Sequence, residues 1–344
     1  MNIYDTILLG NGLTISILQN IQKTCKEELN KEERLICNQN EFIAYLLSCP
    51  IDCSLYKGLL HICTFDSFSS CEIEKIRSAH EKAKKEFFQY DELTGQSHID
   101  YIRQNGFEAW GGVHCFDNES SLYKRNKELV YSINNYWFYL LRKDILSKAG
   151  AKNVVNKTAR VISSFSNRLT LNFDTIIDDY CSVEHLHGSF INNFKRWGDL
   201  LFFEYGINSF EYPYLFGTNA FEKQVRINRI RKKKKEGDYY NFDFFFNENR
   251  YYGNVLIYGV GFSESSIKQY SSLPFFVLEK SASYYNCLDG HIIKRLVMLQ
   301  KTGRVNRITI VSHKESEVPK YQRLINLSGI GADIVVGVTL ESIA

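Results

Sequence analysis

The segment from Thr6 to Leu18 constrains the fold of this chain more than any other. Thr6-Ile-Leu-Leu9 is a short apolar run, Gly10-Asn-Gly12 follows at once, and Leu13-Thr-Ile-Ser-Ile-Leu continues in a helical pattern. Strands buried in a parallel sheet are continuously apolar, as this run is. A buried strand, a glycine turn and a helix start are typical of the first βα unit of a nucleotide-binding fold. The glycines fit equally well a tight turn that binds no ligand.

The later part of the chain repeats this arrangement of a strand, a polar or glycine turn and a helix. Strands are expected at 168–174, 182–187, 254–258, 307–311 and 333–336, with a helix over Thr175–Tyr180 after the first of them. The pattern predicts an α/β fold with a Rossmann-like, open, mostly parallel sheet, which binds its ligands at the carboxyl ends of the strands.

A large helical insertion is expected between the first two strands. The chain is therefore divided into a Rossmann-like domain formed by residues 1–18 and 167–344 and a helical insertion formed by residues 19–166. Helices are predicted there over 71–88, 120–131 and 154–164, with no strands between them. The aromatic-rich segment 191–253 is expected to be an irregular excursion.

Composition sets limits on partners and location. The chain has 344 residues and a net charge of +3, which is too small for a general nucleic-acid binder. It contains no apolar run long enough to span a bilayer, and its first residues lack the features of a signal peptide, so we expect a cytoplasmic protein without a membrane partner. The nine cysteines include no CxxC pair, which favours free thiols over a zinc site.

Asn172-Phe-Asp174 stands at the end of the second predicted strand, where an α/β sheet presents its ligand-facing residues. An asparagine there can hydrogen-bond a ribose hydroxyl or position a water molecule. Asp174 has two interpretations of equal weight, since an aspartate before Thr175 also fits a simple helix cap. Capping explains Asn172 less well, because it lies inside the strand end.

His185-Leu-His187-Gly188 ends the next predicted strand, and residues two apart in a strand share a face. A metal pair is conceivable, but no third ligand follows at a recognisable spacing. A histidine acting as general base beside Gly188 is the more plausible functional interpretation. A histidine buried in the core is the alternative that requires no function.

Two further segments have both a functional and a structural interpretation. Gly259-Val-Gly261-Phe-Ser263 follows the predicted strand at 254–258 and fits either a turn that wraps a ribose or adenine or an ordinary loop. The basic run Arg226 to Lys235 fits a nucleic-acid or acidic-partner patch, and it equally fits a solvated surface, because the rest of the chain has no basic bias.

Together and in this order, these segments resemble the sirtuin-like superfamily of NAD-consuming enzymes. Gly10-Asn-Gly-Leu-Thr14 is similar to the sirtuin Gly-Ala-Gly-Ile-Ser loop, Thr170-Leu-Asn-Phe-Asp174 to its Thr-Gln-Asn-Ile-Asp motif, and His185-Leu-His187-Gly188 to its catalytic His-Gly strand end. The GNG turn and the long helical insertion most resemble bacterial antiphage members, namely the defence-associated sirtuin-like NADases and the abortive-infection AbiH family. The motifs cover roughly a fifth of the chain.

The resemblance implies a role for each matching residue. Three would be catalytic: Asn172 would position the nicotinamide ribose or the attacking water, Asp174 would support that geometry, and His187 would act as the base. The residues that would bind NAD are Gly10, Asn11, Gly12 and Thr14 around the phosphates and nearby ribose, Gly188 beside the base, and Gly259, Gly261 and Ser263 on the adenosine side.

The chain also departs from the sirtuin pattern. Sirtuin deacylases carry a four-cysteine zinc module after the His-Gly strand, whereas here Cys287 is the only cysteine beyond Gly188. Protein deacylation and a bound metal are therefore not expected. Gly261 stands where the third glycine motif usually has a serine, which puts the adenosine contacts in question.

The resemblance thus implies an NAD+ hydrolase that yields nicotinamide and ADP-ribose, or a cyclised relative, and acts in antiphage defence by depleting NAD. It also implies a homo-oligomer under the control of a phage-derived or partner-protein activator. A rival hypothesis is a non-catalytic module that senses NAD or ADP-ribose and regulates a partner. A third is a nucleic-acid effector that acts through Arg226 to Lys235.

Overall fold

The computed structural model describes residues 3–63, 69–92, 95–106, 129, 132–134, 136–172, 174–186, 190–197, 200–205, 249–262 and 290–343. Its centre is a six-stranded sheet in the order β10-β9-β8-β1-β4-β5. The bounds of these strands are β1 Thr6–Leu9, β4 Asn167–Thr170, β5 Glu184–His185, β8 Gly253–Tyr258, β9 Val305–Ser312 and β10 Ala332–Val336. All neighbouring pairs are parallel, so the predicted Rossmann-like α/β fold is confirmed.

The path of the chain through this sheet places a binding position. From β1 the chain passes to β4 and β5 on one side, and then returns to β8 on the other side of β1 before it continues to β9 and β10. This is the order 3-2-1-4-5-6 of doubly wound dinucleotide-binding sheets. The direction reverses between β1 and β8, and ligands of such sheets bind at the carboxyl ends of the two strands at that reversal.

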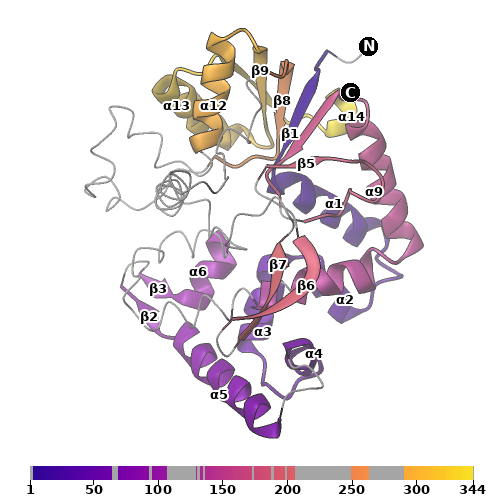
Figure 1. Ribbon diagram of the computed structural model, residues 1–344, viewed down its shortest axis with the longest axis vertical. Helices are drawn as coiled ribbons and strands as arrows, with labels where there is room; N and C mark the ends of the chain where they lie inside the picture. Colours follow the sequence, from indigo (N-terminus) through magenta and orange to yellow (C-terminus); the bar gives the residue numbers. More distant parts are fainter. Residues whose placement is uncertain are drawn as a thin grey trace, which may run out of the picture.

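Helices cover both faces of the sheet. Alternate residues of the strands point to opposite sides: Ile7 and Leu9 of β1 belong to one buried cluster and Leu8 to the other. Helices α1 (Asn11–Thr24) and α9 (Ala149–Ile162) pack on the first face, and α12 (Gly290–Lys301) and α13 (Val318–Ser328) pack on the second (Figure 1). The short helix α14 (Leu340–Ile343) contacts α9.

The predicted helical insertion is present. Its described elements are α2 Lys31–Ile36, α3 Gln39–Ser48, α4 Ser54–Cys63, α5 Ser70–Phe87, α6 His98–Asn105 and a π-helical turn at Leu141–Ile145. In Figure 1 these helices lie below the carboxyl ends of the sheet strands. The helix predicted over 71–88 corresponds to α5, that over 154–164 begins earlier as α9, and most of that over 120–131 lies outside the described residues.

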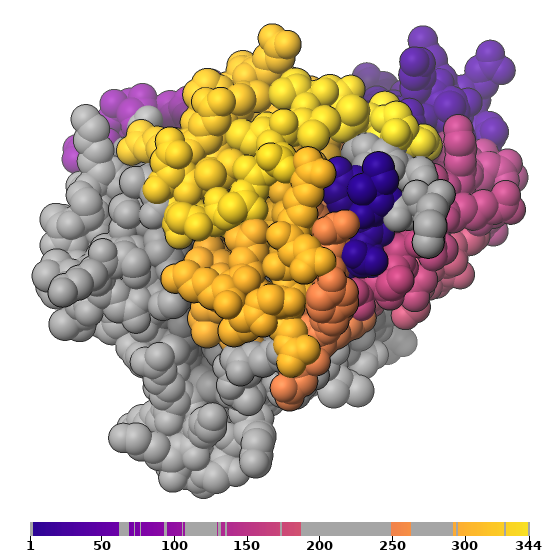
Figure 2. Space-filling view, turned by 90° about the horizontal axis from the view of Figure 1, so that it is seen from above, coloured from indigo at the N-terminus to yellow at the C-terminus, as the bar shows by residue number. Residues whose placement is uncertain are grey.

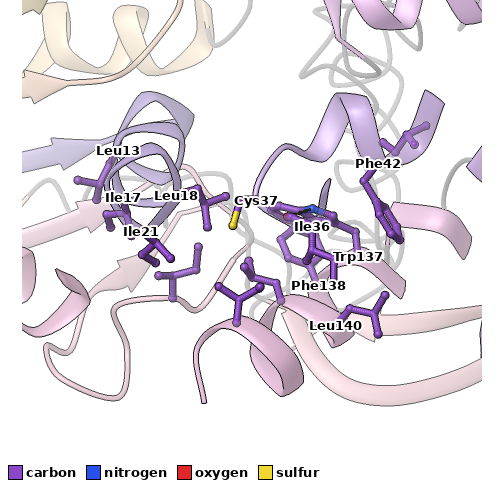
Figure 3. Close-up of a cluster of buried hydrophobic side chains, with 14 of the residues drawn as sticks. Leu13, Ile17, Leu18, Ile21, Ile36, Cys37, Phe42, Trp137, Phe138 and Leu140 are labelled. Carbon is purple, nitrogen blue, oxygen red and sulfur yellow. Dashed lines mark hydrogen bonds between the residues drawn. The ribbon is translucent and has the colours of Figure 1, made fainter. Parts of the chain in front are cut away.

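One apolar core connects the first sheet face with the insertion. The buried face of α1 packs with Ile36 and Cys37 at the end of α2, and Trp137 packs beside them (Figure 3). The indole of Trp137 donates a hydrogen bond to the carbonyl of Ile36 at 2.5 Å. The division at residues 18 and 166 stays a prediction, although α1 continues to Thr24 and β4 begins at Asn167.

Several predicted elements differ from those observed. The strand expected to reach residue 174 ends at Thr170, and β5 is restricted to Glu184–His185. The helix predicted over Thr175–Tyr180 is a series of turns, because its backbone bonds mostly span three residues: Asp178 donates to Thr175 at 3.4 Å and Tyr180 to Ile177 at 3.0 Å.

Two hairpins lie where no strands were expected. One joins β2 (Tyr90–Asp91) to β3 (Gln96–Ser97) inside the insertion. The other joins β6 (Phe190–Trp197) to β7 (Leu200–Tyr205), at the start of the segment interpreted as irregular. Gly198-Asp199 between two aromatic-rich runs is a two-residue hairpin signal that the sequence interpretation missed.

The amino-terminal and carboxyl-terminal parts of the described chain lie side by side. Seen from above, the amino-terminal residues in indigo lie next to carboxyl-terminal residues in yellow (Figure 2). In Figure 1 this is the end of the molecule at which β1 begins, opposite the insertion.

Among the described residues, no helix combines the length and the hydropathy that crossing a bilayer requires.

Candidate functional site at the carboxyl edge of the sheet

Two glycine turns meet at the reversal point between β1 and β8. The amide of Gly10 donates to the carbonyl of Tyr258 at 2.9 Å, and the amide of Gly12 donates to the carbonyl of Gly259 at 2.8 Å. The turn after β1 is thereby attached to the turn after β8. Sequence analysis treated the two turns as separate candidates, and the structure brings them into direct contact.

The contact explains why these positions are glycine. A Cβ atom on Gly10 would lie 2.5 Å from the Gly259 carbonyl oxygen, and one on Gly12 would lie 2.7 Å from the Gly259 Cα. Gly259 itself has φ +71°, in the left-handed region that glycine favours, and its added Cβ would lie 2.7 Å from the Leu13 nitrogen. Mutual packing of the turns is therefore sufficient to require the glycines, with or without a ligand.

The first turn leads directly into α1. Gly10 is the N-cap residue in an extended conformation, no side chain caps the helix, and its first turn contains no acidic residue. Asn11, the first helical residue, is exposed. The amides and dipole at a helix N-terminus favour an anion, and no carboxylate of the first turn competes with one here.

A buried hydrogen-bonded chain links α1 to the segment after β4. The Asn172 side-chain amide donates to the Thr14 hydroxyl at 2.9 Å, and that hydroxyl donates to Asp174 Oδ2 at 2.6 Å. All three residues are buried. The resemblance implied that Thr14 holds a phosphate or ribose, but its hydroxyl instead connects the two polar residues of the second motif.

The orientation of the Asn172 carboxamide is fixed by the glycine turn. Its Nδ2 also donates to the carbonyl of Gly10 at 3.2 Å. A carbonyl only accepts hydrogen bonds, so the nitrogen must face Gly10 and Thr14. Both amide protons are engaged, and Oδ1 has no hydrogen-bond partner among the described residues. The acceptor oxygen is thus the part of this side chain that a ligand hydroxyl would meet.

Asp174 makes two hydrogen bonds within the protein, one to the backbone that follows it and one to α1. Its Oδ1 accepts from the amide of Ile176 at 3.2 Å, which starts the turns at 175–180, while Oδ2 accepts from Thr14. Burial raises the pKa of Asp174, and the hydrogen bonds from Thr14 and the Ile176 amide oppose that rise. The carboxylate of Asp174 therefore fixes the backbone that follows it, and it is a buried titratable group close to Asn172.

His185 contacts the segment after β4 at two points, Asn172 and Asp178. Its Nδ1 lies 2.8 Å from the carbonyl of Asn172, and its Nε2 lies 2.9 Å from Asp178 Oδ1. Burial of the ring lowers the pKa of His185, but the hydrogen bond and charge of Asp178, with the Asn172 carbonyl and the Asp174 charge, outweigh burial and raise it. Sequence analysis assigned no specific role to His185 and did not single out Asp178.

The helical insertion contacts this segment through Arg142, which belongs to the π-helical turn. Its guanidinium donates to the carbonyl of Thr175 at 3.1 Å and pairs with Asp179 at 3.1 Å; it also donates to the Thr175 hydroxyl. π-Helical turns inside helices are frequent at functional sites. No sequence signal pointed to Arg142, because its partners are 33 and 37 residues away.

The structure brings six of the predicted residues together: Gly10, Gly12, Thr14, Asn172, Asp174 and Gly259. Asn11 follows in the same turn, and Gly261 is exposed two residues beyond Gly259. Four of the predictions concern residues outside the described ranges, namely His187, Gly188, Ser263 and the basic run Arg226 to Lys235. Within the described ranges, no group of three or more His, Cys, Asp or Glu side chains is placed to hold a metal ion.

Comparison with known proteins adds no relative. No family model matches this chain, and neither a curated protein nor a solved structure shows significant similarity to it.

Proposed function

We propose that this chain binds NAD+ at the carboxyl edge between β1 and β8 and hydrolyses the bond between nicotinamide and ribose. One observation carries the proposal. Two glycine turns meet where the strand order reverses, and hydrogen bonds attach the carboxamide of Asn172 to the first turn. Reversal points of doubly wound sheets are where dinucleotides bind.

The proposed binding mode follows from the start of α1. The diphosphate would lie at the N-terminus of this helix beside the exposed Asn11, where the helix dipole favours an anion. The nicotinamide ribose would then lie towards β4, near Asn172 and Asp174. This arrangement agrees with the order of motifs on which the sirtuin-like resemblance rests.

The proposed chemistry needs few groups. When the glycosidic bond breaks, its electron pair goes to the nicotinamide nitrogen and positive charge develops on the ribose; water then adds to the ribose carbon and loses one proton. A preorganised carboxylate and carbonyl oxygen stabilise developing positive charge. Asp174 and Asn172 Oδ1 are suited to that task, and His187 is assigned to the proton transfer by the resemblance alone.

Release of nicotinamide from NAD+ by the purified chain tests the proposal. Chromatography should detect nicotinamide and ADP-ribose, and Asn172→Ala should lower the rate about a hundredfold or more. Asn20→Ala, which changes an exposed asparagine on the same helix as the glycine turn, is the matched control and should leave the rate unchanged. Equal rates for the wild type and Asn172→Ala would contradict the assignment.

In the cell we propose that this activity depletes NAD during phage infection. Homo-oligomerisation and an activator, phage-derived or from a partner protein, belong to the same proposal, because an unrestrained NADase would harm its own cell. Measuring cellular NAD in infected cells that carry wild-type or Asn172→Ala protein tests it. A fall of NAD in both strains, or in neither, would contradict the defence role.

One observation favours a second candidate, a sensor that binds NAD or ADP-ribose without turnover. The Thr14 hydroxyl and both Asn172 amide protons are already engaged within the protein. These two side chains therefore use their hydrogen-bond donors to hold the protein together. They offer no free donor to a bound ligand. Calorimetry separates the candidates: saturable binding of NAD+ with no nicotinamide release, in the presence of infected-cell extract as well, would favour the sensor.

A further inference from the structure

We propose that His185, held by Asp178, is a positioning residue that fixes the main chain of Asn172 by keeping one proton between the ring and the Asp178 carboxyl group. The proposal rests on the proposed function only in connecting Asn172 with a substrate. The clamp itself is a property of the free protein, so it can be tested without NAD.

The hydrogen-bond pattern requires that shared proton. The carbonyl of Asn172 only accepts, so Nδ1 of His185, 2.8 Å away, must carry a proton and donate it. Nε2 lies 2.9 Å from Asp178 Oδ1, and a lone pair cannot face a carboxylate at that distance without repulsion. One proton must lie between these two atoms, so that the pair is an imidazolium with a carboxylate or a neutral ring with a carboxylic acid.

The surroundings hold the pair in place. The side chain of His185 is only 8% exposed, and the backbone of β5 is fixed beside β4, where the amide of Leu186 donates to the carbonyl of Thr170 at 2.9 Å. The other oxygen of Asp178 is buried and has no hydrogen-bond partner among the described residues. Asp178 therefore has His185 as its hydrogen-bonded partner, which favours retention of the shared proton.

The charged groups that face the ring are acidic. Asp178 contacts it directly and Asp174 acts on it through its charge. The neighbouring Glu184 does not join them, because its carboxylate pairs with Arg250 at 2.9 Å. Arg142 contacts the same turns from the other side, through Thr175 and Asp179.

The consequence concerns Asn172. Its amide donates to the Thr170 hydroxyl at 3.0 Å, its carbonyl accepts from His185, and its side chain bonds to Gly10. The main chain of Asn172 is thus held at both polar groups, and its carboxamide follows. When pH rises through the raised pKa of His185 and the proton leaves, the Nε2 lone pair meets the Asp178 carboxylate, and the clamp weakens.

Amide hydrogen exchange at Asn172, measured by NMR without ligand, tests the clamp. We expect His185→Phe, which keeps a ring but removes both bonds, to raise the exchange rate about tenfold or more relative to the wild type. Glu184→Gln, a neighbouring change on the same strand, is the control and should leave the rate unchanged. Wild-type exchange at Asn172 in His185→Phe would overturn the proposal.

Asp178→Asn provides a second test that does not depend on folding of the histidine variant. An asparagine amide can donate to a neutral His185 ring, so the geometry persists without the shared proton. The wild type should show exchange that accelerates beyond the intrinsic pH effect as pH rises through the raised pKa of His185, and Asp178→Asn should lose this excess. If the variant keeps the wild-type excess, the shared proton is not the cause and the proposal fails.

Turnover gives a third readout, for active protein only. His185→Phe should lower kcat for nicotinamide release about tenfold and leave the Kd for ADP-ribose within about threefold, since the clamp positions Asn172 rather than binding the phosphates. An unchanged kcat would contradict the positioning role. If the wild type releases no nicotinamide, the proposed hydrolysis fails, and the exchange measurements still decide the clamp.

Discussion

The hydroxyl of Thr14 on α1 donates to the carboxylate of Asp174 at 2.6 Å, across 160 residues of sequence. The same hydroxyl accepts from Asn172. This one side chain therefore joins the first glycine turn to the polar segment after β4, and the interaction is buried. The polar side chains of the candidate site are therefore connected by hydrogen bonds and do not act as independent residues.

Thr14→Val should destabilise the protein, because it removes both hydrogen bonds of the Thr14 hydroxyl. Valine keeps the volume but leaves Asn172 Nδ2 and Asp174 Oδ2 each short of a buried partner, so we expect a loss of about 1–3 kcal/mol in the free energy of unfolding. Thr24→Val at the exposed end of the same helix removes a bond to the carbonyl of Asn20 and a weak one with the Cys25 thiol, and should cost about 0.5 kcal/mol or less. Denaturant unfolding of both variants checks this, and equal losses would contradict the account.

Gly259→Ala should separate backbone strain from close packing. Gly259 and Gly303 both have positive φ, +71° and +69°, but an added Cβ meets Leu13 at 2.7 Å in the first and nothing within 4 Å in the second. Gly303→Ala should therefore cost about 1–2 kcal/mol of stability from conformation alone. Gly259→Ala should cost more and also weaken ADP-ribose binding, measured by thermal unfolding and calorimetry; a smaller loss than Gly303→Ala would refute the contact between the turns.

Arg142→Ala should loosen the turns that carry Asp174 and Asp178. The pair with Asp179 is largely exposed, so the loss of global stability should be at most about 1 kcal/mol. Hydrogen exchange over residues 175–180 should nevertheless increase, because four bonds to that segment disappear. Arg77→Ala, which removes another exposed pair of the insertion, is the control and should leave that exchange unchanged.

The buried carboxylate of Asp174 predicts a pH effect with a definite sign. Burial raises the pKa of Asp174 above 3.8, so the folded state binds this proton more tightly than the unfolded state. Its contribution to stability is complete below about pH 3.8 and is lost as pH rises through the folded pKa. The unfolding free energy of the wild type minus that of Asp174→Asn should therefore fall as pH rises; a difference that grows with pH would contradict the burial.

The sequence predicted the sheet well because its signals are local. Apolar runs followed by glycine identified β1 and β8, and a continuous apolar strand needs no knowledge of its partners. The helix predicted over Thr175–Tyr180 was wrong, because Asp178 and Tyr180 donate to carbonyls only three residues earlier and Arg142 binds the carbonyl of Thr175. A single sequence does not reveal a contact such as that of Arg142.

The candidate site was predictable only in part. Asn172 and Asp174 could be singled out because they follow an apolar strand, where an α/β sheet presents its ligand-facing residues. The sequence did not reveal the contacts made by His185, Asp178 and Arg142. These contacts involve backbone carbonyls or partners distant in sequence, and such contacts produce no recognisable motif. The interpretation of Thr14 as a ligand residue stays a prediction, since its observed contacts are within the protein.

The position of ADP-ribose in a crystal structure of the complex tests the central claim most directly. The account predicts the diphosphate at the N-terminus of α1 beside Asn11 and the terminal ribose within hydrogen-bond distance of Asn172 Oδ1. ADP-ribose bound elsewhere on the molecule, or no binding at millimolar concentration to protein with intact Thr14–Asp174 and Gly12–Gly259 contacts, would contradict it.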